Sequence, residues 1–164
     1  MKVNDIMKPK GACTIVIREG YTKSGKKAYF RGRIKSQDRI DNTFVTVGKN
    51  SIASALSGVE TNNQGIITYC AVGTSVVAAT LADTTLTTEI FRKLISVRSV
   101  SGKVATFQTF FTTAEANGTL RECGLFGDSA SSTANSGTLF SKLAINRVKS
   151  ASDTLTLSWD ITIG

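Results

Sequence analysis

The sequence predicts an all-β protein: a single antiparallel β-sandwich of about eight or nine strands with one or two short helices. Short apolar runs rich in β-branched residues alternate with turn sequences along most of the chain. Long amphipathic segments of the kind that link the strands of a parallel α/β sheet are not found between these runs. Residues 153–164 alternate without a fault between apolar and polar side chains, which is the pattern of a half-buried antiparallel strand.

This closing segment is the strongest strand prediction in the sequence. Its apolar face carries five large side chains, namely Leu155, Leu157, Trp159, Ile161 and Ile163. Burying one such side chain contributes roughly 1.5–3 kcal/mol, so the strand needs a second sheet to cover it. We therefore expect Trp159 to belong to the core and not to a surface platform for sugar stacking.

The chain is expected to have two parts: a basic N-terminal arm, residues 1–10, and a single β-sandwich domain, residues 11–164. The arm is basic and has little reason to pack on its own. Strands are expected at residues 14–17, 28–35, 44–47 and 66–72. Between them, the apolar spacing predicts a short helix over residues 48–58, with Asn50 or Ser51 as its N-cap and Gly58 as its end.

In the second half of the chain, turn sequences mark the ends of the expected strands. Asp83 is a candidate cap for one helical turn that carries Leu86 and Ile90. Ser101-Gly102 predicts a hairpin between strands at residues 91–100 and 103–112. Further strands are expected at residues 119–126, with Leu120, Glu122, Gly124 and Phe126 on one face, and from residue 139 onwards. The Ser-rich segment 127–137 is expected to be an exposed loop.

The amino-acid composition limits the kinds of catalysis and metal binding that are expected of the chain. The chain has no histidine, which removes imidazole-based catalysis and imidazole metal ligands. Its three cysteines, Cys13, Cys70 and Cys123, form no C-x-x-C pair and are expected to be buried thiols, not a disulfide framework or zinc site. The carboxylates show no paired spacing for glycoside hydrolysis, and glycine-rich phosphate loops are not present in the sequence. We expect a protein that is not an enzyme and needs no cofactor or metal.

Targeting signals are also not evident in the sequence. No apolar run approaches the roughly 18 residues of a membrane span. The first residues lack the order of a secretory signal. These observations predict a soluble protein that is made in the cytoplasm and has no membrane partner.

The net charge of +8 is unevenly placed, because residues 1–50 hold 12 Lys and Arg against four acidic residues, whereas the remainder is neutral. One face of the expected strand at residues 28–35 is basic. A solvated edge strand protected from aggregation explains this pattern, and so does contact with an acidic protein surface. Nucleic acid is the weakest of the three interpretations, because few aromatic residues accompany the charges. The candidate partner-binding residues are Lys8, Lys10, Lys26, Lys27, Arg31, Arg33 and Lys35.

An ordered series of short motifs extends over residues 66–164. They are YCAVGT at 69–74, DT at 83–84, LTTEIFR at 86–92, EANGTLRECGLF at 115–126, GTLFS at 137–141 and TLTLSWDITI at 154–163. In order and spacing the series resembles small virion proteins of tailed bacteriophages. The portion R-E-x-G-L-F … G-T-L-F is also similar to the attachment domains of phage tail and collar fibres.

This resemblance implies a non-enzymatic building block that assembles in symmetric copies on the virion, either as a capsid accessory or decoration protein or beside the collar or tail. Its partners would be other virion proteins and further copies of the chain. In the motif, Asn117-Gly118 would form a tight turn and Gly124 would admit a close neighbour. Arg121 and Glu122 would pair across strands or subunits, and Trp159 belongs to the closing strand.

Two other functions remain open at this stage. A glycan- or receptor-binding module of a tail fibre would recognise the host surface through its loops, yet residues 127–137 contain no aromatic side chain for stacking. A nucleic-acid-binding protein would use the basic strand expected at residues 28–35, and its affinity would fall steeply with salt.

Overall fold

The computed structural model describes residues 9–20, 32–58 and 64–163. Within these ranges the chain forms ten strands and one helix, which confirms the predicted all-β sandwich. The elements are β1 (Lys10–Glu19), β2 (Ile34–Asp41), β3 (Thr43–Phe44), α1 (Thr46–Ser57), β4 (Ile67–Gly73), β5 (Glu89–Leu94), β6 (Val97–Ser101), β7 (Val104–Phe111), β8 (Gly118–Gly127), β9 (Thr138–Lys149) and β10 (Asp153–Thr162).

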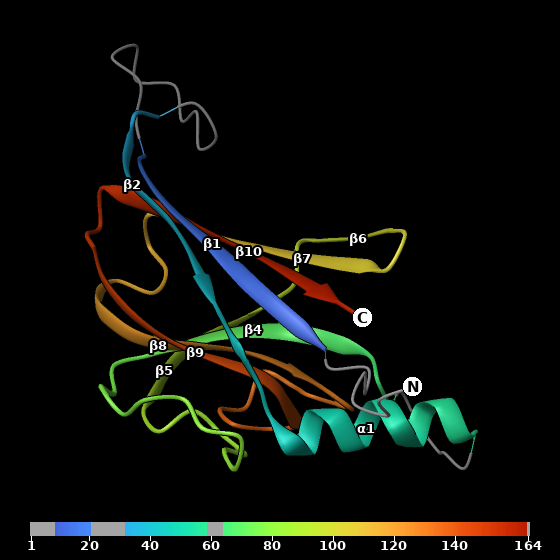
Figure 1. Ribbon diagram of the computed structural model, residues 1–164. Coiled ribbons are helices and arrows are strands. Elements are labelled where there is room, and N and C mark those ends of the chain that lie inside the picture. The colour runs from blue at the N-terminus through green and yellow to red at the C-terminus, as the bar shows by residue number, and fades with distance from the viewer. Residues whose placement is uncertain (1–8, 21–31, 59–63, 164) are drawn as a thin grey trace.

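The strands form two antiparallel sheets of five. Sheet A has the order β2-β1-β10-β7-β6, and sheet B has the order β3-β9-β8-β4-β5. Figure 1 shows the two sheets stacked on one another, with α1 beside sheet B, where it contacts β9. The central strand of sheet A is β10, and β1 pairs with it along its whole length, from Lys10 opposite Thr162 to Glu19 opposite Asp153.

The core lies between the sheets and includes the closing strand. Leu155, Leu157 and Trp159 of β10 are completely buried and Ile161 nearly so, whereas Ile163 lies beyond the end of the strand and is 39% exposed. The burial of Trp159 agrees with its expected place in the core. The three cysteines are buried free thiols, as predicted, and burial raises the pKa of Cys70 and of Cys123 above the ordinary value.

The predicted strand at residues 91–100 is two strands in different sheets, and the expectation of one strand was wrong. The chain crosses between the sheets at Ile95 and Ser96. The backbone N–H of Ile95 donates to Thr68 O of sheet B (2.9 Å), and that of Ser96 donates to Gln108 O of sheet A (2.8 Å). The hairpin between β6 and β7 is confirmed, and Gly102, with a φ of 55°, supplies the positive φ that its tight turn needs.

Two predicted helical features are corrected. Helix α1 begins at Thr46, after an extended Val45, and not at Asn50 or Ser51; its end at Gly58, with a left-handed φ of 66°, is as predicted. The earlier start is possible because Gly48 lies against β9, where a Cβ would stand 2.6 Å from Phe140 Cα. Asp83 does not cap a helical turn: its carboxylate accepts hydrogen bonds from the N–H and hydroxyl of Thr80 in a loop.

Strand boundaries near the basic segment also differ from the prediction. The expected strand at residues 28–35 lies largely outside the described residues, and β2 runs from Ile34 to Asp41. This edge strand carries mainly polar side chains, which is why apolar alternation did not predict it. Strand β1 runs from Lys10 to Glu19 and is longer than the strand expected at residues 14–17.

A β-bulge changes the expected face of strand β8. Its pairing with β9 shifts register between Leu120 and Glu122. Leu120 therefore points into the core between the sheets, whereas Phe126 belongs to a second apolar cluster that includes Leu86 and Leu139. This second cluster lies on the face of sheet B that is turned away from sheet A, which we call the outer face of sheet B.

Candidate interaction surface

The loop of residues 74–88, between β4 and β5, is held on the outer face of sheet B by a buried carboxylate. Glu122 of β8 is completely buried. Its Oε2 accepts a hydrogen bond from the N–H of Thr87 (3.0 Å), and its Oε1 accepts one from the N–H of Thr88 (2.6 Å). The carboxylate of Glu122 thus supplies the hydrogen-bond acceptors that these two backbone N–H groups would otherwise find on a neighbouring strand.

A buried lysine completes this anchor. Lys142 of β9 lies diagonally across from Glu122, because Gly124 is its register partner on β8. Its Nζ lies 3.3 Å from Glu122 Oε2 and 3.2 Å from Asp83 Oδ2, and the Lys142 side chain is 2% exposed. The same ammonium group donates to Thr87 Oγ1. A buried charge needs this many partners, since an unpaired ammonium group in the interior is very costly.

A second buried ion pair secures the loop of residues 128–137. Arg92 and Glu89 form a two-point pair (2.5 and 2.8 Å) with side chains 3% and 2% exposed. The Arg92 guanidinium lies 4.5 Å from the ring centre of Phe126. Its Nη1 donates to the backbone oxygens of Ser131 and Ser136, which draws the loop towards sheet B.

Asn135 joins the two loops to each other. Its Oδ1 accepts from the N–H of Leu86 (3.0 Å), its Nδ2 donates to Leu86 O (3.1 Å), and its own N–H donates to Glu89 Oε2 (3.0 Å). Residues 127–137 were expected to be an exposed loop. Residues 131–134 are exposed, whereas Asn135 and Ser136 are half-buried in these contacts.

These contacts fix an apolar surface that faces solvent. Val76, Val77 and Leu81 of the first loop are 77%, 52% and 57% exposed, and residues 74–82 contain no charged side chain. We call these three residues the apolar loop surface. The loop is attached to sheet B at Asp83, Thr87 and Thr88, and Leu81 O accepts a hydrogen bond from the N–H of Thr46 (2.9 Å), so the backbone that carries the three exposed side chains is held in place.

The other motif residues have structural contacts within the chain. Asn117 donates to Thr113 O (2.9 Å) and accepts from Lys149 Nζ (2.7 Å), and Gly118, with a φ of 126°, follows it into β8. Gly124 lies under the first loop: a Cβ there would stand 2.9 Å from Leu139 Cδ1 and 3.1 Å from Leu86 Cδ2.

The resemblance implied that Arg121 and Glu122 pair across strands or subunits, and both residues contact the neighbouring strand β9. Glu122 forms its ion pair with Lys142 (3.3 Å), and Arg121 Nη1 donates to Asn146 Oδ1 (2.7 Å). Sequence reasoning missed the partners of Glu122, because Thr87, Thr88 and Lys142 come from distant parts of the chain and share no spacing with it. The only signal in the sequence was a Glu and a Lys within otherwise apolar strands.

Three of the predicted partner-binding residues lie in the described part of the chain, and they do not gather into one patch. Lys10 begins β1, whereas Arg33 and Lys35 lie near the other end of that strand, about 30 Å away at the usual rise per residue. Arg33 pairs with Glu19 (2.8 Å), and Lys35 pairs with Asp153 (3.0 Å). The remaining predicted contact residues, Lys8, Lys26, Lys27 and Arg31, lie outside the described residues.

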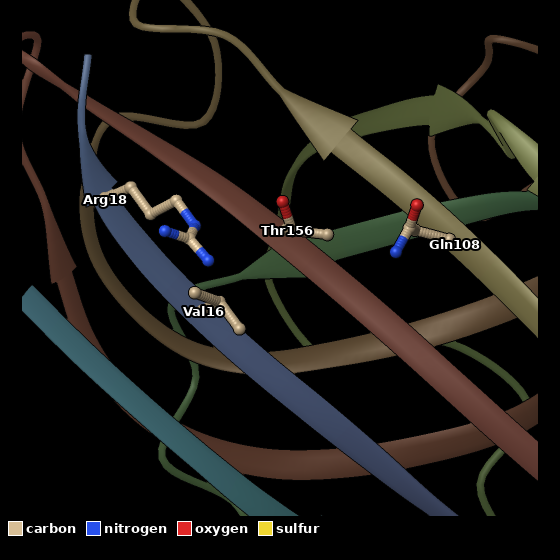
Figure 2. Close-up of a pocket in the computed structure, with 4 residues that line it drawn as sticks. All are labelled: Val16, Arg18, Gln108 and Thr156. Atoms are coloured by element: carbon tan, nitrogen blue, oxygen red, sulfur yellow. The ribbon is translucent and has the colours of Figure 1, made fainter. Parts of the chain in front are cut away.

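The opposite face of the sandwich, formed by sheet A, carries a shallow hollow of about 200 Å³. Figure 2 shows the four side chains that line it standing on the same side of the sheet: Val16, Arg18, Gln108 and Thr156. Arg18 Nη1 donates to Gly32 O (3.1 Å), so part of its charge is already satisfied. The hollow is open and has one cation and two neutral polar groups, which does not define a catalytic arrangement.

Several carboxylates stabilise the fold in their ionised form. Burial alone would raise the pKa of Asp83, Glu115 and Asp153, but hydrogen bonds and lysine contacts outweigh it and hold each pKa below its ordinary value. The lysines are Lys142 for Asp83, Lys93 for Glu115 and Lys35 for Asp153.

We expect the protein to lose stability in acid. A carboxyl whose pKa is depressed on folding contributes stability that is complete above its ordinary value, here 3.8 for Asp and 4.5 for Glu, and that is lost as pH falls through the folded value. The midpoint of thermal unfolding should therefore fall steadily below about pH 4.5. Asp153→Asn should make this decline shallower, and a midpoint that is constant down to pH 3 would contradict the assignment.

Comparisons with known proteins give no relatives: no protein-family model, curated protein or solved structure matches the chain. Among the described residues no helix has the length and hydropathy to cross a membrane. In the same part of the chain, acidic and cysteine side chains do not gather in threes as metal ligands.

Proposed function

We propose that the protein is a non-enzymatic structural subunit of a tailed bacteriophage virion, which assembles in symmetric copies as a capsid accessory or decoration protein or as a collar- or tail-associated protein. The phage assignment rests on the ordered motifs of residues 66–164. The structural role is supported by what those motifs do in the fold, since Glu122, Gly124, Glu89 and Arg92 all serve to position the two loops on sheet B.

The observation that carries the proposal is the apolar loop surface. Exposed valine and leucine side chains on a fixed loop favour contact with another protein, because that contact removes them from water without first having to order the loop. Buried ion pairs contribute little net stability in general. The buried Lys142 network attaches the first loop at Asp83, which favours a role for this loop in contact with a partner.

A second exposed apolar surface on the same chain fits assembly from identical subunits. All five residues of the edge strand β6 are exposed, and Val97 and Val100 are 52% and 77% exposed. Contact between two different surfaces of identical chains is heterologous, and such contacts close into rings when the rotation permits. We therefore propose further copies of this chain as the partner of the apolar loop surface.

Assembly can be tested with charged substitutions. The double variant Val76→Asp/Val77→Asp should abolish the discrete oligomer seen by light scattering and the incorporation of the chain into purified virions, because two carboxylates would be desolvated at the contact. Val148→Asp is the matched control, since Val148 is 66% exposed on β9 and lies outside the proposed surface. Recovery of the wild-type chain only from the soluble fraction of a phage lysate would refute the proposal.

A further inference from the structure

Three groups at the base of the first loop have the composition of a reactive site. Lys142 Nζ lies 3.2 Å from Asp83 Oδ2 and 3.3 Å from Glu122 Oε2. The side chains of Lys142 and Glu122 are 2% and 0% exposed, and that of Asp83 is 20% exposed. A primary amine and a carboxyl group are thus held in contact, away from most water, beside a second carboxylate.

We propose that Lys142 and Asp83 become joined by an amide bond after folding, with Glu122 as the group that transfers a proton. This modification depends on the three side chains alone and not on the proposed function. It would attach the first loop covalently to β9.

The reaction is a condensation, and its atoms balance without an oxidant or any other reactant. A proton moves from the Lys142 ammonium group to Asp83 Oδ2, which gives a neutral amine and a neutral acid. Nζ then attacks Asp83 Cγ and forms the C–N bond. Glu122 accepts a second proton from Nζ and delivers it to the hydroxyl group on Cγ, the C–O bond breaks, and one water molecule leaves.

The geometry favours the attack and the second proton transfer, whereas the first proton transfer is uphill. Burial alone would raise the pKa of Asp83, but the hydrogen bonds from Thr80 and the contact with Lys142 lower it, so the neutral pair is a minor state. Groups held in contact react with high effective concentration. Glu122 is fixed for proton transfer by the N–H groups of Thr87 and Thr88. The bond needs to form only once in each chain, so a slow reaction is sufficient.

A second lysine–carboxylate pair, Lys93 and Glu115, serves as a comparison, because its two groups are in contact but are more exposed. Lys93 Nζ lies 2.6 Å from Glu115 Oε2, which is closer than the contact between Lys142 and Asp83. These side chains are 31% and 24% exposed, and within the described part of the chain the hydrogen bonds of the pair include no second carboxylate to transfer the proton. We expect this pair to remain an ion pair.

The intact mass of the purified, denatured protein tests the proposal. The wild-type chain should be lighter than its sequence mass by one water molecule, and proteolytic mapping should find a branched peptide that joins residues 83 and 142. Asp83→Ala, Lys142→Arg and Glu122→Gln should each have their full sequence mass. A wild-type chain that keeps its full mass after prolonged incubation in the folded state would overturn the proposal. So would loss of water that maps to any other pair, including Lys93 and Glu115.

Discussion

Glu122→Ala is expected to lower the free energy of unfolding by about 3–5 kcal/mol. In the folded chain before any amide bond forms, the substitution removes one carboxylate partner of the buried Lys142 ammonium group and leaves the N–H groups of Thr87 and Thr88 without their acceptor. Removing one member of a buried ion pair is costly because the other charge stays desolvated. Chemical denaturation monitored by tryptophan fluorescence would measure the loss, because Trp159 is the only tryptophan and lies in the core.

The neighbouring residue provides the control for this experiment. Arg121 is on the same strand and donates to Asn146 near the surface. Arg121→Ala should cost less than about 1 kcal/mol, as exposed polar contacts usually do. Equal effects of the two substitutions would mean that burial of the Glu122 network is not what makes it important. Glu122→Ala should also increase hydrogen exchange in residues 83–88, because the first loop loses its attachment to β8.

Gly124→Val is expected to cost about 3 kcal/mol, at the upper end of the usual effect of overpacking. A Cβ at this position would stand 2.9 Å from Leu139 Cδ1, 3.0 Å from Ser141 O and 3.1 Å from Leu86 Cδ2. The leucine side chains can move by a few tenths of an ångström, but the carbonyl oxygen belongs to the paired strand β9 and cannot. The two additional methyl groups of valine would push Leu86 outward and lift the first loop from sheet B.

Thermal unfolding and assembly should both report this change. Ser99→Val is the control for thermal unfolding alone, because it adds similar bulk to an exposed position on β6, where valine has a favourable strand propensity but where the surface is itself proposed to take part in assembly. It should leave the unfolding midpoint nearly unchanged. A Gly124→Val variant with the wild-type midpoint and normal assembly would show that the close packing of loop and sheet at this position is not required.

The elements predicted well are those whose sequence reports a local cause. Strand β10 is amphipathic with a period of two, and its register against β1 keeps that pattern from Leu155 to Ile161. The hairpin at Gly102 and the end of α1 at Gly58 both depend on a positive φ, which glycine adopts at little cost. Such signals need no knowledge of distant partners.

The features that were missed depend on partners far away in the sequence. Strand β2 has few apolar side chains and is a strand because β1 offers it hydrogen bonds. The switch of sheets at Ile95 and the bulge after Leu120 are set by neighbouring strands, and a period of two cannot predict either. The candidate surface was missed for the same reason: Glu122, taken alone, is indistinguishable from a solvated acidic residue.

The antiparallel pairing of β1 with β10 has a mechanical consequence. Lys10 and Thr162 are register partners, so the two ends of the domain emerge together at one pole of the molecule. Tension applied between the ends would open the ladder like a zipper, one residue pair at a time from that pole. Tension between opposite poles would load all ten residue pairs of β1 and β10 together in shear. We expect the domain to resist the second direction of force far better than the first, so its orientation within an assembly would decide how much load it can carry.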